Sequence, residues 1–115
     1  MSPELKARFV QVEKGTLDYI VAAVVHTFNP SKLILFGSRA EGRATEESDM
    51  DLLVVHNALI DPRDTFDFTS RLSDEVGIPV QLILITKEVY EETKDIIGGI
   101  AYPATKYGMV IYEKP

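Results

Sequence analysis

The sequence predicts a single α/β (α+β) domain, residues 1–115, in which helices flank a small mixed β-sheet. Short apolar runs, typical of buried strands, alternate along the chain with segments whose apolar residues recur at helical spacing. A chain of 115 residues is also long enough to bury one core but short for two. The predicted order is helix, strand, turn, strand, helix, strand, helix, strand.

The first predicted helix has its apolar residues on one face. Between residues 17 and 28 they recur at intervals of three and four, the spacing of a helix that packs against a core. We expect this helix to begin near Pro3, behind the N-cap candidate Ser2, although Gly15 could divide it in two. Asn29 precedes a proline and should end the helix.

The remaining elements follow at short intervals. Apolar runs predict four strands, at residues 33–36, 51–55, 80–85 and 109–112. Capping residues and apolar spacing predict helices at 64–76, with Asp64 as N-cap and Gly77 as C-cap, at 87–93 behind the N-cap Thr86, and, as a weaker helical turn, at 96–102.

Composition and charge exclude several classes of function. A net charge of −6 disfavours binding of duplex nucleic acid through its phosphates. Without cysteine the chain has neither disulfides nor a Cys-ligated metal. The sequence shows neither a signal peptide nor an apolar run of the length that a membrane span needs. We therefore expect a cytoplasmic protein without a membrane partner, and leave open whether it forms a homo-oligomer.

Two aspartates stand one residue apart where the second predicted strand begins. Side chains at i and i+2 of a strand point to the same face, so Asp49 and Asp51 should bring two carboxylates together. Such close like charges repel each other unless a cation lies between them, and Mg²⁺ prefers oxygen ligands that water and substrate phosphates complete. Alone, however, an Asp-x-Asp pair is more often a turn that faces water.

Gly37 and Ser38 follow the first predicted strand and strengthen the interpretation of the two aspartates as metal ligands. A glycine lets the backbone turn sharply or approach a ligand, and Ser38 adds a hydroxyl. If a helical turn begins at Ser38 and ends at Gly42, its N–H groups form an anion site. An ordinary junction capped by serine is the alternative. Together with the aspartates the pair gives the pattern G-S-x10-D-x-D, which indicates phosphates held beside metal-binding carboxylates.

The stretch L-F-G-S-R-A-E-G-R-A-T-E-E-S-D-M-D-L-L-V resembles the signature of the DNA polymerase β-like nucleotidyltransferase superfamily, and within it the minimal nucleotidyltransferases. The resemblance covers about residues 17–113. It implies that Gly37 and Ser38 bind the phosphates of the nucleotide. It also implies that Asp49 and Asp51 are catalytic ligands of Mg²⁺, with two ions expected.

The sequence departs from the family pattern at one position. Where the next strand of the family carries a third carboxylate, this chain has Gln81. A glutamine can ligate through its carbonyl oxygen, but it adds no charge and cannot accept a proton from an attacking hydroxyl. Arg39, in the loop between the turn and the aspartates, could contact a phosphate bidentately. Alternatively, it is a surface charge that balances the glutamates nearby.

The resemblance implies transfer of a nucleoside monophosphate, with AMP from Mg-ATP as the expected donor, to a hydroxyl group. In the family, short proteins of this kind pair with a small all-helical protein of the HEPN type, as the antitoxin half of a toxin-antitoxin system. The alternative is a nucleotide- or partner-binding module that keeps the fold and has lost turnover through Gln81.

Overall fold

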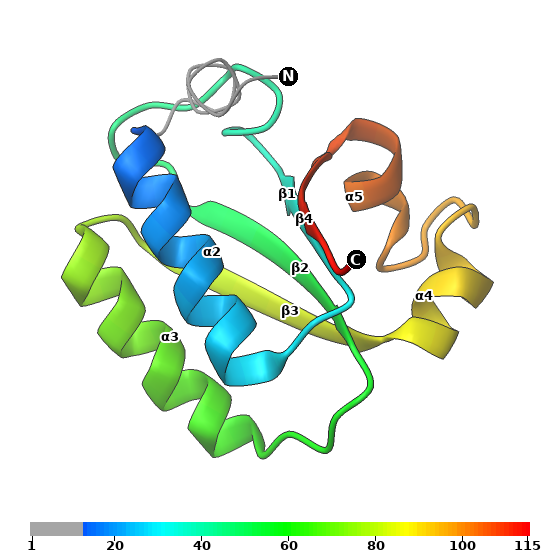
Figure 1. Ribbon diagram of the computed structural model, residues 1–115. Helices are drawn as coiled ribbons and strands as arrows, with labels where there is room; N and C mark the ends of the chain where they lie inside the picture. Colours follow the sequence, from blue (N-terminus) through cyan, green and yellow to red (C-terminus); the bar gives the residue numbers. More distant parts are fainter. Residues whose placement is uncertain (1–12) are drawn as a thin grey trace.

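A computed structural model describes residues 13–115 as a four-stranded mixed sheet with helices on both faces (Figure 1). The strand order is β3-β2-β1-β4. β1 is antiparallel to both β2 and β4, whereas β2 and β3 are parallel. In chain order the elements are α2 (Lys14–Phe28), β1 (Lys32–Phe36), β2 (Met50–His56), α3 (Pro62–Val76), β3 (Val80–Thr86), α4 (Lys87–Thr93), α5 (Tyr102–Tyr107) and β4 (Met109–Glu113).

The predicted α/β class and the four strands are confirmed. α2 begins at Lys14, one residue before Gly15, behind the N-cap Glu13 with a non-helical ψ of 143, and it ends at Phe28, where Asn29 takes a left-handed conformation with φ +46. The predicted start near Pro3 lies outside the described residues. Thr86 caps α4 as predicted, since its hydroxyl accepts a hydrogen bond from the N–H of Val89 at 3.2 Å.

Two helix boundaries were predicted wrongly. α3 begins at Pro62, and its N-cap is Asp61, not Asp64: the Asp61 carboxylate accepts a hydrogen bond from the N–H of Arg63 at 2.8 Å. A proline in the first turn favours this start. The weak helix predicted at 96–102 is instead a series of turns, because Gly98 takes φ +90. α5 begins only at Tyr102, with a proline in its first turn.

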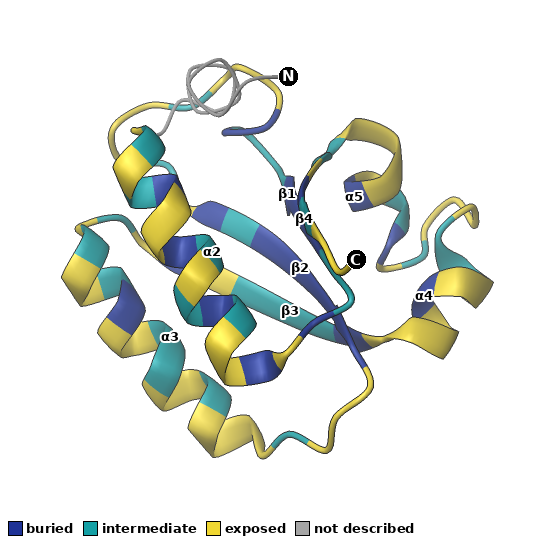
Figure 2. Ribbon diagram, viewed as in Figure 1, coloured by how far each residue is buried: buried dark blue, intermediate teal, exposed yellow. Residues whose placement is uncertain are grey.

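Each face of the sheet carries its own apolar cluster. α2 and α3 lie side by side on one face, where Leu52 and Val54 of β2 point (Figure 1). α4 and α5 lie on the other face, where Leu53 and Val55 point. Because alternate side chains point to opposite faces, β2 is buried on both sides along most of its length (Figure 2). Asp51 interrupts this pattern at the start of the strand.

Within residues 13–115, the structure contains no helix that is long and apolar enough to cross a bilayer.

Candidate active site

Gly37 and Asp51 lie against each other, and this contact joins the two halves of the sequence motif. The antiparallel register of β1 and β2 places Phe36 opposite Asp51. Gly37 follows directly, with φ +77, in the left-handed region that favours glycine. A Cβ atom at Gly37 would lie only 2.5 Å from Oδ2 of Asp51. The missing side chain at position 37 therefore lets the Asp51 carboxylate lie beside the turn.

Gln81 lies next to Asp51 on the neighbouring strand. The parallel register of β2 and β3 pairs these two residues directly. Both side chains point to the α4–α5 face of the sheet, because Leu53 and Ile83, two residues further along each strand, pack there. Gln81 is exposed, and Asp51 is partly buried. Position 81 thus places a side chain beside Asp51 on the same face of the sheet, and this side chain carries an amide.

Asp49 lies one residue before β2, outside the strand, and its charge acts on Asp51. β2 begins at Met50, whose N–H donates to the carbonyl of Pro79 at 2.8 Å. Asp49 is exposed. Burial raises the pKa of Asp51, and the negative charge of Asp49 raises this pKa further. The two carboxylates therefore repel each other, which is the repulsion that a bound cation relieves.

We expect Asp51→Asn to raise the free energy of unfolding of the metal-free protein at neutral pH. The pKa of Asp51 is higher in the folded than in the unfolded chain, so ionisation of this carboxyl opposes folding. That penalty is present above the folded-state pKa and absent below the unfolded-state pKa. Urea unfolding in EDTA, from about pH 8 down to about pH 3, should show the gain shrinking to nothing in acid. A gain that persists or grows in acid would contradict this cause.

The segment after Gly37 forms a single turn whose hydrogen bonds have helical spacing, as considered from the sequence. The N–H groups of Ala40 and Glu41 donate to the carbonyl of Gly37 at 3.1 and 3.2 Å, and the N–H of Arg43 donates to the carbonyl of Ser38 at 3.0 Å. Gly42, at φ +74, ends the turn. Ser38 is half-buried at its start.

Arg39 is buried beneath the loop that leads to Asp49, with 5% of its surface exposed. Its Nε and Nη2 atoms donate to the carbonyl oxygen of Ser48 at 3.1 and 2.9 Å, and Nη2 also lies 3.4 Å from the carbonyl oxygen of Thr45. The interpretation of Arg39 as a surface charge is therefore wrong. The predicted phosphate contact stays a prediction, and the bonds from Nε and Nη2 go to the backbone of the protein itself.

The loop that Arg39 contacts is also closed by its own side chains. The hydroxyl of Ser48 accepts a hydrogen bond from the N–H of Thr45 at 2.8 Å, and the N–H of Ser48 donates to the carbonyl of Thr45 at 3.1 Å. The N–H of Glu47 donates to the Thr45 hydroxyl at 3.3 Å. No role for Thr45 was predicted from the sequence. The signal that could have indicated this role is the spacing of Thr45 and Ser48. Two hydroxyl residues three apart can form local hydrogen bonds between side chain and backbone.

The side chains at this site offer oxygen ligands of the kind that Mg²⁺ prefers. Asp49 and Asp51 supply carboxylates, and Gln81 supplies an amide oxygen. Among residues 13–115, no three His, Cys, Asp or Glu side chains gather closely enough to hold a metal by themselves. Mg²⁺ commonly binds through one or two carboxylates and completes its shell with water and substrate phosphates. The residues therefore fit a divalent cation that binds together with a nucleotide.

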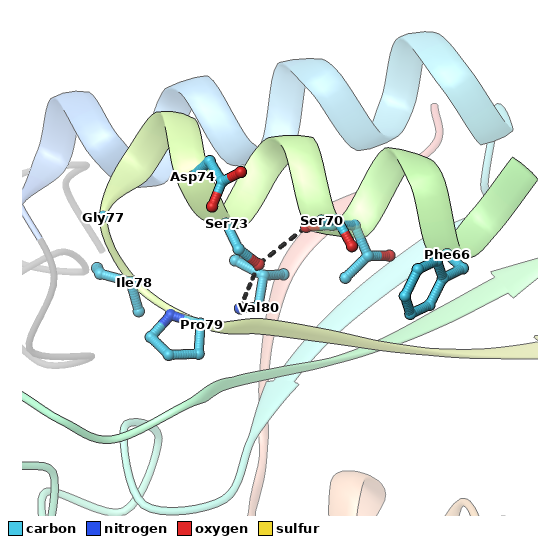
Figure 3. Close-up of a pocket in the computed structure, with 9 residues that line it drawn as sticks. Phe66, Ser70, Ser73, Asp74, Gly77, Ile78, Pro79 and Val80 are labelled. Atoms are coloured by element: carbon cyan, nitrogen blue, oxygen red, sulfur yellow. Dashed lines mark hydrogen bonds between the residues drawn. The ribbon is translucent and has the colours of Figure 1, made fainter.

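A groove lies elsewhere, between α3 and the start of β3 (Figure 3). It has a volume of about 620 Å³. The hydroxyl of Ser73, in its wall, accepts a hydrogen bond from the N–H of Val80 at 2.9 Å and donates to the carbonyl of Thr69 at 2.8 Å. Because Val80 packs in the α2–α3 cluster, this groove is on the opposite side of the sheet from Asp51.

Fold and site together define a class of protein. A glycine turn after one strand contacts a carboxylate on the next, in a mixed α/β sheet, and this is the arrangement that the motif predicts for a nucleotidyltransferase. The family model described as polymerase beta nucleotidyltransferase matches residues 19–114. The chain belongs to this family.

Individual relatives agree with the family. A candidate protein adenylyltransferase from Methanocaldococcus jannaschii is 36% identical over 81 residues, which cover 70% of this chain and 77% of that protein. A chain in the crystal structure of a toxin-antitoxin with AMP-PNP has a TM-score of 0.63 at 16% identity, covering 85% of this chain and 73% of its own length.

Two further solved structures share the fold. One contains a tri-AMPylated HEPN toxin of Shewanella oneidensis in complex with an MNT antitoxin, with a TM-score of 0.62 at 13% identity and coverage of 88% and 72% of the two chains. The other is a candidate nucleotidyltransferase from Sulfolobus solfataricus, with a TM-score of 0.56 at 18% identity and coverage of 99% and 90%. At these identities the likeness shows the fold.

Proposed function

We propose that this protein transfers AMP from Mg-ATP to a hydroxyl group of a partner protein. The observation that carries the proposal is the contact between Gly37 and the Asp51 carboxylate, which brings a phosphate-binding turn and a cation ligand to one point. Membership of the nucleotidyltransferase family supports the reaction class. The Methanocaldococcus jannaschii relative, by its name, supports an adenylyl group as the group transferred and a protein as acceptor.

Each residue of the site has a proposed role. The Gly37–Ser38 turn seats the triphosphate, with the glycine allowing close approach and the serine offering its hydroxyl. Asp49 and Asp51 hold Mg²⁺, which neutralises phosphate charge and orients the nucleotide when it is bound. From the resemblance to the family we expect two Mg²⁺ ions. Gln81 lies beside Asp51 and contributes an amide oxygen without charge.

The proposed reaction is an in-line displacement at the α-phosphorus of ATP. The acceptor oxygen forms a bond to this phosphorus, the bond to the oxygen that bridges the α- and β-phosphorus breaks, and pyrophosphate leaves with that electron pair. The acceptor hydroxyl loses its proton. Gln81 has no ionisable group to take this proton, so we assign it to water or to a phosphate oxygen of the substrate.

The proposed partner is a small all-helical protein of the HEPN type, with this chain as the antitoxin half of the pair. The support is that structures with this fold include chains from toxin-antitoxin complexes, one of which contains an AMPylated HEPN toxin beside an MNT antitoxin. A nucleotide-bound complex among them also supports ATP as the donor.

A second function is favoured by one observation, the amide at position 81. If turnover needs a third carboxylate, the chain is a nucleotide- or partner-binding module that keeps the fold. Such a module would bind Mg-ATP but transfer no label. Both functions therefore predict binding of Mg-ATP, and only the transferase function predicts transfer of label.

We expect the wild-type protein to transfer label from α-labelled ATP to a HEPN-type partner in the presence of Mg²⁺ or Mn²⁺. Asp49→Asn should reduce the transfer rate by at least about 100-fold, because one cation ligand loses its charge. Label on the partner, followed by gel autoradiography and mass spectrometry, measures this. Transfer that appears only after Gln81→Asp would support the binding module instead. Failure of ATP to bind with either cation would exclude both nucleotide functions.

A further inference from the structure

The site contains a buried cation that the proposed reaction does not use. Arg39 is 5% exposed, and a guanidinium is almost never buried unless its charge is compensated. Its Nε and Nη2 atoms donate to backbone carbonyl oxygens, those of Ser48 and Thr45, at 2.9 to 3.4 Å. Two of its N–H groups converge on the single oxygen of Ser48. This is the behaviour of a residue that holds a loop in place.

The position of Arg39 in the chain connects the two halves of the site. It directly follows the Gly37–Ser38 turn, and the residue whose carbonyl it holds, Ser48, directly precedes Asp49. Backbone hydrogen bonds to the carbonyls of Gly37 and Ser38 close the turn that contains Arg39 and fix its backbone. The Arg39 side chain therefore reaches from the turn to the backbone of the residue that precedes Asp49.

We propose that Arg39 is a positioning residue that fixes the backbone of Asp49 relative to the Gly37–Ser38 turn. The role of Arg39 in catalysis rests on the proposed function. The hydrogen bonds that Arg39 makes do not depend on that function. Asp51 is placed by strand pairing and by its contact with Gly37. Asp49 lies outside the strand, so strand pairing does not fix its backbone, and the loop before it must do so. Arg39 fixes this loop through its hydrogen bonds to the carbonyl oxygen of Ser48.

Hydrogen exchange in the metal-free protein tests this inference apart from any activity. In Arg39→Lys and Arg39→Met, the amides of Thr45 and Ser48 should exchange at least about tenfold faster, because hydrogen bonds from a charged donor are lost or reduced. Lysine keeps the charge but lacks the planar fork that donates two N–H groups to one oxygen. The amides of α3 should keep their wild-type rates. Equal acceleration in the loop and in α3 would mean general destabilisation and would overturn the inference.

Cation and nucleotide binding distinguish positioning from direct contact with phosphate. Titration with Mn²⁺ alone should show the dissociation constant rising at least about fivefold in both variants, since one of the two carboxylates is no longer held in place. Binding of ATP in EDTA should change by less than about twofold, because a positioning residue does not touch the phosphates. The opposite result, weaker ATP binding with unchanged loop exchange and Mn²⁺ affinity, would assign Arg39 to the phosphates and overturn the inference.

Arg63 provides the matched control. Its side chain is 89% exposed at the start of α3 and contacts Asp61 at 3.3 Å. Arg63→Lys and Arg63→Met make the same chemical changes at a site remote from Asp49. They should leave the exchange of the loop amides and the Mn²⁺ affinity at wild-type values. Loop exchange that rises equally in the Arg63 variants would show that loss of any arginine has this effect, and would also overturn the inference.

Discussion

Gly37→Ala should lower the rate of adenylyl transfer by at least about 100-fold, the effect expected when a reacting group is displaced by about 1 Å. The new Cβ atom would lie 2.5 Å from Oδ2 of Asp51, so the carboxylate must move out of the position in which we propose that it holds the cation. The positive φ of Gly37 also strains any other residue, by about 1–2 kcal/mol. Transfer kinetics and urea unfolding measure the two effects separately.

Gly77→Ala is the matched control for this prediction. Gly77 ends α3 with φ +71, close to the +77 of Gly37, but a Cβ atom there would have no heavy atom within 4 Å. The two variants should therefore lose similar free energies of unfolding, about 1–2 kcal/mol, and only Gly37→Ala should lose transfer. If both lose transfer in proportion to their stability, the contact with Asp51 has no special role.

Gln81→Asp should raise the transfer rate, by as much as about 100-fold if a positioned base is the limiting element. The register places residue 81 directly beside Asp51, so an aspartate there restores a charged ligand and a proton acceptor to the site. The half-saturating Mg²⁺ concentration should fall in the same variant, because a third carboxylate adds negative charge around the cation. Initial rates at a series of Mg²⁺ concentrations measure both quantities.

Two neutral or isosteric changes at the same position control for shape. Gln81→Asn has the length of aspartate without its charge and should leave the rate within about threefold of wild type. Gln81→Glu has the shape of glutamine with a charge added and should share part of the gain. A rate that stays unchanged in the aspartate and glutamate variants would show that position 81 does not limit transfer, and that the wild-type site is complete as it stands.

Most of the fold could be predicted from the sequence, because its elements have strong local signals. The apolar runs of β1 and β2 and the N-cap Thr86 each report a local preference that the tertiary structure keeps. The errors lie where two signals compete. Asp61 and Asp64 both precede apolar residues, and only Pro62 in the first turn decides between them. At Gly98 a backbone preference prevails over apolar spacing.

The site residues could be named from the motif, but their packing could not. Sequence spacing indicates that Gly37 and Asp51 belong together, whereas the register of β1 and β2 supplies the contact. The placement of Gln81 beside Asp51 needs the parallel pairing of β2 and β3. The burial of Arg39 was not predictable, because a charged residue in a polar loop is normally exposed. Only the folded loop shows that its backbone carbonyls face the guanidinium.

The antiparallel pairing of β1 with β2 has a consequence for how the site forms during folding. These strands are consecutive in the chain, so the contact between Gly37 and Asp51 requires only a local loop to close, which is faster and costs less entropy than closing a longer loop. Residue 81 joins later, because β3 must first be brought alongside β2 by the α3 crossover. The pair of Gly37 and Asp51 is therefore a local unit to which the third position is added, and a change of residue at 81 leaves that unit intact.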